Sequence, residues 1–148
     1  METSLYNTIA IIVAIVSLAG TSSLSIITLV QESKENRKLH QLTIFSEYTK
    51  RYNEIMYEMP EEVFGNEAKL TPETRKCARL YFNLCSEEFY LKEHGLVNPE
   101  IWDNWADGMA TRMKSPTLQK EWETMREEEY FDSFRNFMDE LIDNNDNR

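Results

Sequence analysis

The hydrophobic pattern divides the chain near residue 31. Residues 5–30 contain no charged side chain, whereas charged residues recur every few positions from Glu32 onward. At about 1.5 Å per residue, a helix over this run is roughly 39 Å long, which exceeds the ~30 Å hydrocarbon core of a bilayer. The pattern therefore predicts a tail and one transmembrane helix within residues 1–31, with residues 5–30 in contact with membrane lipid.

A cleaved secretory signal is the alternative interpretation of this run. Such a signal begins with positively charged residues and ends at a small-residue cleavage site. Residues 1–8 contain no Lys or Arg, and a second apolar segment, residues 24–30, follows the small residues at 19–23. Because a signal peptide does not need that second segment, we expect an uncleaved anchor.

Basic residues predict the orientation of the anchor. None precedes the run, and five follow it closely: Lys34, Arg37, Lys38, Lys50 and Arg51. Since Lys and Arg beside a span favour the cytoplasmic side, we expect the N-terminus outside and a helical domain, residues 32–142, in the cytoplasm. Residues 143–148 are expected to form a disordered acidic tail.

One heptad seam of the predicted span carries mostly small or polar residues. Helices associate in lipid through close approach of small residues and through interhelical hydrogen bonds. The seam therefore suggests self-association of the anchors, although small residues are common in spanning helices generally. Its small or polar members are Asn7, Ala10, Ala14, Ser17, Thr21 and Thr28.

After the span, residues 31–59 carry an apolar stripe at spacings of three and four, which predicts a helix. Pro60 restricts the backbone of Met59 and ends this helix. Because no Gly or Pro separates the helix from residues 5–30, the two can form one continuous helix. The stripe consists of Leu42, Phe45, Tyr48, Tyr52, Ile55, Met56 and Met59.

Three later helices have start signals, each an N-cap residue followed by proline. These signals are Thr71-Pro72, Asn98-Pro99 and Ser115-Pro116, with Thr117 as an alternative start for the last of the three. Gly95 suits the end of the first of these helices, and a last helix is expected over about residues 132–143. Because no segment alternates like a strand, the sequence predicts an all-α fold: an N-terminal transmembrane helix followed by an antiparallel bundle of four to five helices.

The helix expected after Pro72 has a broad apolar face, and Glu88 falls near the middle of it. A buried carboxylate must be protonated, paired or hydrogen-bonded, because burying an isolated charge is unfavourable. Lys92, one turn later, is a suitable partner. Glu88 is then either a general acid or base with a raised pKa or, as we favour, a structural hydrogen-bond acceptor. The apolar face consists of Cys77, Leu80, Tyr81, Leu84, Cys85, Phe89 and Leu91.

Two further pairs of residues have a structural and a functional interpretation. Cys77 and Cys85 are about 12 Å apart on a helix, which exceeds the ~7 Å limit for a disulfide, so we expect buried free thiols. Trp102 and Trp105 are either large core residues, which we favour, or an aromatic wall of a ligand site.

Composition narrows the classes of function. The chain has 16 Lys and Arg against 26 Asp and Glu, a net charge of −10. Nucleic-acid-binding proteins need a basic surface, so no nucleic-acid partner is expected. The sequence contains no phosphate-binding glycine loop, nucleophile elbow, zinc-ligand spacing or paired Glu-x-x-His motif. We therefore expect no catalytic residues, no metal and no cofactor.

Two segments carry a resemblance. Residues 45–56, FSEYTKRYNEIM, and residues 80–105, LYFNLCSEEFYLKEHGLVNPEIWDNW, follow an N-terminal span. In this order they resemble small uncharacterised single-pass membrane proteins of bacteria and phages with an aromatic-rich helical cytoplasmic domain. The resemblance implies an inner (plasma) membrane location and brings no activity or site residues with it.

These observations favour a nonenzymatic, membrane-anchored helical module that binds a protein partner or self-associates in a regulatory role. An alternative is an effector that perturbs the membrane when its anchors oligomerise, for example in phage defence. A third, less favoured, is an enzyme that uses Glu88.

Overall fold

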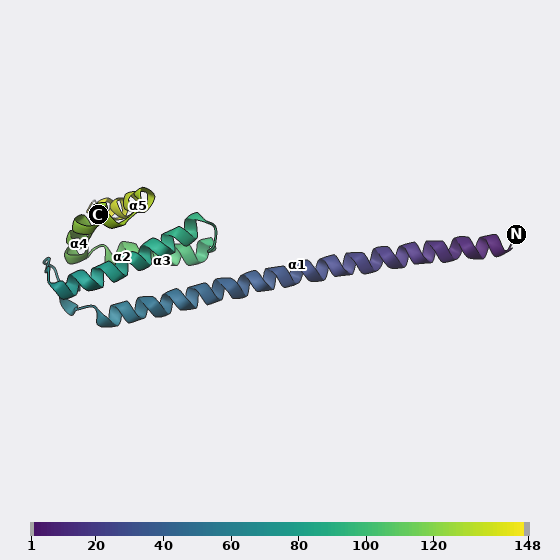
Figure 1. Cartoon of the computed structure of the whole chain (residues 1–148), viewed down its shortest axis with the longest axis horizontal. Coiled ribbons are helices and arrows are strands. Elements are labelled where there is room, and N and C mark those ends of the chain that lie inside the picture. Colours follow the sequence, from purple (N-terminus) through teal and green to yellow (C-terminus); the bar gives the residue numbers. More distant parts are fainter. Residues whose placement is uncertain (1, 147–148) are drawn as a thin grey trace. The chain divides into compact units, whose positions relative to one another are not determined.

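In the computed structural model, residues 2–146 form five α-helices and one short 3-10 helix (Figure 1). The structure describes the backbone of these residues and the side chains of residues 6, 28–127 and 130–144. No strand occurs among them, which confirms the predicted all-α fold. The elements are α1 (Glu2–Glu58), η1 (Glu61–Phe64), α2 (Pro72–Glu93), α3 (Pro99–Arg112), α4 (Pro116–Glu129) and α5 (Asp132–Asp146).

The chain divides into two compact units, Met1–His40 and Gln41–Arg148. Helix α1 begins in the first unit and ends in the second. Among the residues that the structure describes, no helix is both long and apolar enough to cross a membrane. The side chains of residues 7–27, which include most of the predicted span and its seam from Asn7 to Thr21, lie outside the described ones; that of Thr28 is exposed.

The predicted starts at Thr71 and Asn98 are confirmed, and for α4 the structure selects Ser115-Pro116 over Thr117. Thr71 accepts a hydrogen bond from the backbone N–H of Thr74 at 3.1 Å, and the Asn98 side chain accepts one from the third residue of α3 at 2.8 Å. Ser115 accepts the equivalent bond at the start of α4 at 3.2 Å. These caps satisfy backbone donors that a helix leaves unpaired at its N-terminus. Gly95, with φ of +64°, follows α2 in the left-handed conformation that glycine tolerates.

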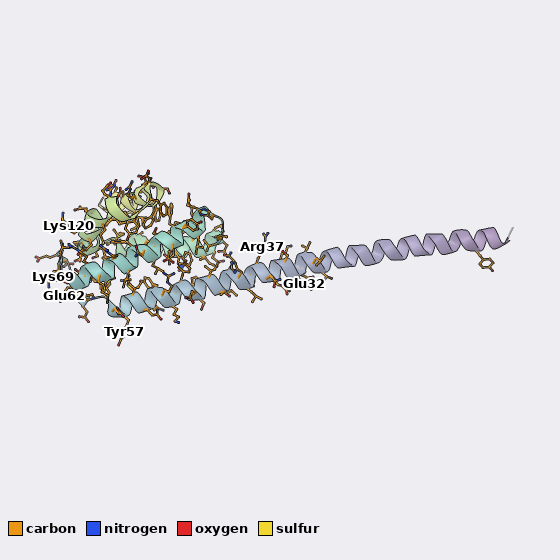
Figure 2. All side chains as sticks on the ribbon, viewed as in Figure 1. Glu32, Arg37, Tyr57, Glu62, Lys69 and Lys120 are labelled. Atoms are coloured by element: carbon orange, nitrogen blue, oxygen red, sulfur yellow. The ribbon has the colours of Figure 1, made fainter. Side chains whose placement is uncertain are left out.

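Within the second unit, α2 and α3 lie between residues 41–58 of α1 on one side and α4 and α5 on the other (Figure 1). Aromatic contacts mark both interfaces: Tyr48 of α1 meets Trp105 of α3 at 5.2 Å between ring centroids, and Phe82 of α2 meets Trp122 of α4 at 5.1 Å. Figure 2 shows side chains filling the space between these helices, whereas Tyr57, 92% exposed, projects outward near the end of α1.

The central position of α2 changes which of its residues are buried. Leu80, predicted in the apolar face, is 41% exposed, whereas Ala78 and Phe82 are fully buried. At about 100° per residue, Leu80 lies at the edge of the predicted face and Phe82 on the opposite edge. Since α2 packs against helices on two sides, its buried arc extends toward Phe82, and that extension was not predicted.

Two further features differ from the sequence prediction: the exposure of Leu42 and the end of α5. Leu42, predicted in the α1 stripe, is 54% exposed, because the neighbouring Gln41 side chain is the one that meets the α2–α3 connection, through the Leu96 carbonyl at 2.8 Å and the Asn98 N–H at 2.8 Å. Helix α5 runs to Asp146, beyond the expected end near Asp143.

The start of α4 is tied to η1 by side-chain hydrogen bonds. The hydroxyl of Ser115 donates to the carbonyl of Val63 while also capping α4. Thr117, fully buried, accepts a hydrogen bond from the backbone N–H of Lys69 at 3.1 Å. The segment between α1 and α2 is therefore held against α4 by two buried hydroxyls.

We expect Ser115→Ala to lower the free energy of unfolding by about 1–2 kcal/mol, because it removes an N-cap and leaves the buried Val63 carbonyl without its donor. Urea denaturation followed by far-UV circular dichroism measures the change. Ser46→Ala, the same substitution at an exposed position inside α1, is the control and should change stability by less than about 0.5 kcal/mol. Equal effects of the two substitutions would contradict the assigned role of Ser115.

Candidate functional site

A pocket of about 560 Å³ lies among α1, α2 and α3 of the second unit. Its size is within the range of small-molecule sites. The exposed polar members of its lining are Asn53, Asn104, Asp107 and Thr111, and buried side chains form the floor. The floor includes Tyr81, Cys85, Glu88, Trp105 and Met109.

Glu88 is placed in this floor by its position on α2. It is 5% exposed and shares the helix face of Tyr81 and Cys85, which lie two turns and one turn earlier. Burial raises the pKa of the Glu88 carboxyl to about 8; the nearby Arg51 charge opposes that shift and the Glu87 charge adds to it. The same burial raises the pKa of the Cys85 thiol. The site therefore holds a carboxyl group that is mostly protonated at neutral pH.

The described residues give the Glu88 carboxyl neither a hydrogen bond nor an ion pair. Lys92, the partner suggested by the sequence, instead bonds to Glu93 at 2.7 Å and lies over the rings of Phe89 and Trp102. The structure thus buries Glu88 as predicted but does not bring Lys92 to it. A role as a structural hydrogen-bond acceptor would require a donor, and these contacts supply none.

The neighbouring carboxylate, Glu87, has the opposite environment. Arg51 binds it through two N–H groups at 2.5 and 2.9 Å, and the Tyr48 hydroxyl donates to it at 3.2 Å. These bonds lower the pKa of Glu87, chiefly through Arg51, and raise that of Arg51. The positive charge that acts on Glu88 is therefore already bound by another carboxylate.

Aromatic side chains supply much of the remaining pocket wall. Phe45, Tyr48 and Tyr52 contribute from α1, Tyr81 from α2 and Trp105 from α3. Each is placed by a helix, so the wall does not depend on loop conformation.

The two tryptophans of α3 have different surroundings. Trp105 lines the pocket, whereas Trp102 packs against Phe89 at 5.9 Å and Phe137 at 5.3 Å in the core. The pair therefore does not form one wall, because residues three apart on α3 face different neighbours. Trp105 is both a buried core residue and part of the pocket wall, which are the two roles suggested for the pair by the sequence.

Arg112 is the basic side chain of the pocket lining. Its Nε donates to the Tyr52 hydroxyl at 2.9 Å, and its guanidinium lies 4.9 Å from the Phe64 ring centroid. These contacts hold the Arg112 charge toward Tyr52 and Phe64.

A second buried acid, Glu121 of α4, was not identified from the sequence. It is fully buried, its Oε2 accepts from Arg75 Nε at 3.1 Å, and its Oε1 has no hydrogen-bond partner among the described residues. The periodicity argument that identifies Glu88 could also have identified Glu121, because Glu121 falls between Leu118 and Thr117 on the buried face of α4. Glu121 is not among the residues that line the pocket.

Of the two cysteines, Cys85 belongs to the pocket lining and Cys77 does not. Cys77 and Cys85 are buried free thiols, as predicted. Among the described residues, no group of three or more His, Cys, Asp or Glu side chains is placed to hold a metal ion.

No family model, curated protein or solved structure matches this chain.

Proposed function

We propose that this chain is a nonenzymatic, single-pass membrane protein whose helical unit binds a partner in a regulatory role. Residues 5–30 anchor it in the inner (plasma) membrane, with the N-terminus outside and Gln41–Arg148 in the cytoplasm. One observation carries the proposal: a charge-free run long enough to span a bilayer precedes a helical unit with its own buried core. Tethering such a unit raises its effective concentration for partners at the membrane.

The pocket among α1, α2 and α3 supports a binding function. Its buried aromatic floor with one unpartnered carboxyl is the combination that small-molecule sites use: apolar area for affinity and a few polar groups for orientation. The general acid or base role of Glu88 also has support, because a raised pKa in a pocket is common in active sites. Glu88→Gln separates the two, since an enzyme would lose turnover while keeping its fold.

The membrane-perturbing effector is the second candidate, and the seam from Asn7 to Thr28 favours it. Clustering of anchors through close approach of small residues is its physical basis. In that case Ala14→Leu and Ser17→Leu, which enlarge the seam, would reduce oligomer size. A nonoligomeric interaction module would be unaffected by either substitution.

We expect the full chain to sediment with membranes and resist carbonate extraction, and a chain beginning at Glu32 to remain in the supernatant. The reason is that residues 5–30 contain the whole predicted apolar span. The mass of each chain gives its oligomeric state and so tests the effector alternative; the longer chain is measured in detergent.

The outcomes separate the candidates. Carbonate release of the full chain would contradict the anchor. An oligomeric full chain beside a monomeric shorter one would favour the effector, because the anchor would then drive assembly. If both are oligomeric, the helical unit carries the contact.

A further inference from the structure

We propose that the pocket among α1, α2 and α3 binds a small organic cation, an ammonium group on a short apolar stem, with the positive charge against Glu88 and the aromatic rings. The inference rests on the proposed binding function of the helical unit and not on its membrane anchor.

The aromatic wall is the first support. Phe45, Tyr48, Tyr52, Tyr81 and Trp105 converge on one cavity from three helices. The faces of such rings carry negative electrostatic potential and attract ammonium groups, most strongly in a desolvated site. The Tyr48 and Trp105 rings, 5.2 Å apart between centroids and inclined at 40°, form a corner between α1 and α3.

The unpartnered Glu88 carboxyl is the second support. It lies in the floor of the same pocket, and the described residues give it no hydrogen bond or ion pair. Buried carboxylates need a positive or hydrogen-bonding partner. A bound ammonium ion supplies that partner.

Two positive side chains lie near the pocket. Arg51 is bound by Glu87 through two hydrogen bonds, which balance its charge, and it lies 5.1 Å from the Tyr48 ring centroid. Arg112 keeps its positive charge but is held by the Tyr52 hydroxyl and lies 4.9 Å from the Phe64 ring centroid, so the rings of Tyr81, Trp105 and Phe45 and the Glu88 carboxyl are the groups left for a ligand cation. Asp107 adds a negative charge to the lining. Tyr81 and Cys85, which share the α2 face of Glu88, have pKa values raised by burial and stay neutral near pH 7.

A neutral ligand is the competing possibility, because a protonated Glu88 can donate a hydrogen bond to an acceptor. The two classes have opposite pH dependence. Binding a cation favours the ionised carboxyl and so strengthens as pH rises toward 8, whereas binding a hydrogen-bond acceptor requires the proton and weakens over the same range.

Choline and its uncharged isostere 3,3-dimethylbutan-1-ol are the probes. They are titrated into the full chain in dodecyl maltoside, a detergent without charge, with calorimetry as the readout. We expect choline to bind at least tenfold more tightly than the isostere, and its Kd to fall by more than about tenfold between pH 6 and pH 8. Short-chain phosphatidylcholine is then added as a competitor. Displacement of choline indicates that the pocket accepts the cation of a lipid headgroup, whereas no displacement indicates a free cation.

Glu88→Gln should weaken choline binding at pH 8 by at least tenfold and remove the pH dependence. Glu121→Gln, the same change at a buried acid outside the pocket, is the matched control and should leave both unchanged. Equal binding of the two probes, binding that weakens with pH, or no choline binding at 50 mM would overturn the proposal. The pH profile of the unsubstituted protein decides between the two ligand classes even if a variant fails to fold. None of these results depends on whether the chain sediments with membranes.

Discussion

Trp122→Ala is expected to lower the free energy of unfolding of the helical unit by about 3–5 kcal/mol, the range for truncating a large aromatic side chain in a core. Trp122 is fully buried. Its ring meets Phe82 at 5.1 Å, Tyr130 at 5.3 Å and Phe134 at 5.6 Å between centroids. Its removal leaves a cavity where α2, α4 and α5 meet.

The substitution also removes a hydrogen bond. The Trp122 indole N–H donates to Asp139 of α5 at 2.9 Å. Arg126 pairs with the other oxygen of that carboxylate at 2.6 Å. Losing the indole therefore weakens the attachment of α5 as well as the packing, so the effect should lie toward the upper part of the range.

Urea denaturation of the detergent-solubilised chain, followed by circular dichroism, measures the change. Tyr57→Ala is the control, because Tyr57 is 92% exposed and points outward (Figure 2); its effect should be under about 0.5 kcal/mol. A loss below about 1 kcal/mol for Trp122→Ala would show that the α2–α4–α5 core is not packed as described.

Glu88→Gln is expected to stabilise the protein at neutral pH by about 3 kcal/mol. The folded-state pKa of Glu88 is about 8, against 4.5 for an unperturbed Glu. Between these two values the folded protein binds more protons than the unfolded chain, so stability falls as pH rises. Each unit of pH in this window costs about 1.4 kcal/mol, and glutamine, which does not ionise, avoids the loss.

The pH dependence tests this assignment. The stabilities of the two proteins should be about equal near pH 4.5, diverge up to pH 8, and then stay parallel. Glu87→Gln is the neighbouring control with the opposite sign: the pKa of Glu87 is lowered, chiefly by Arg51, so removing its charge should destabilise modestly above its ordinary pKa. A Glu88→Gln variant that is less stable at pH 7 would show that the carboxylate has a stabilising partner.

A residue that lowers stability at neutral pH is consistent with a functional group. Functional sites commonly retain groups that are unfavourable for folding. The proposed cation would offset this effect by pairing with the carboxylate, and bound ligand would then raise the stability of the folded state.

The local sequence determined where α2, α3 and α4 begin and where α2 ends. N-cap residues followed by proline, at Thr71, Asn98 and Ser115, start helices by interactions within a few residues. Gly95 ends α2 for the same kind of reason, a local backbone conformation. Such signals act over one turn, so they can be recognised without knowing which helices are neighbours. Periodicity likewise placed Glu88 on a buried face, because a helix has a fixed number of residues per turn.

Only the tertiary structure decided what surrounds each buried face. The arc of α2 that includes Phe82 is buried because α4 packs against it, and nothing within α2 encodes that neighbour. Arg51 pairs with Glu87, 36 positions away in the chain, and leaves Glu88 without a partner, although Lys92 was the nearest suitable base in the sequence. The partner of a buried charge depends on side chains from separate helices, and their positions are set by packing across the whole unit.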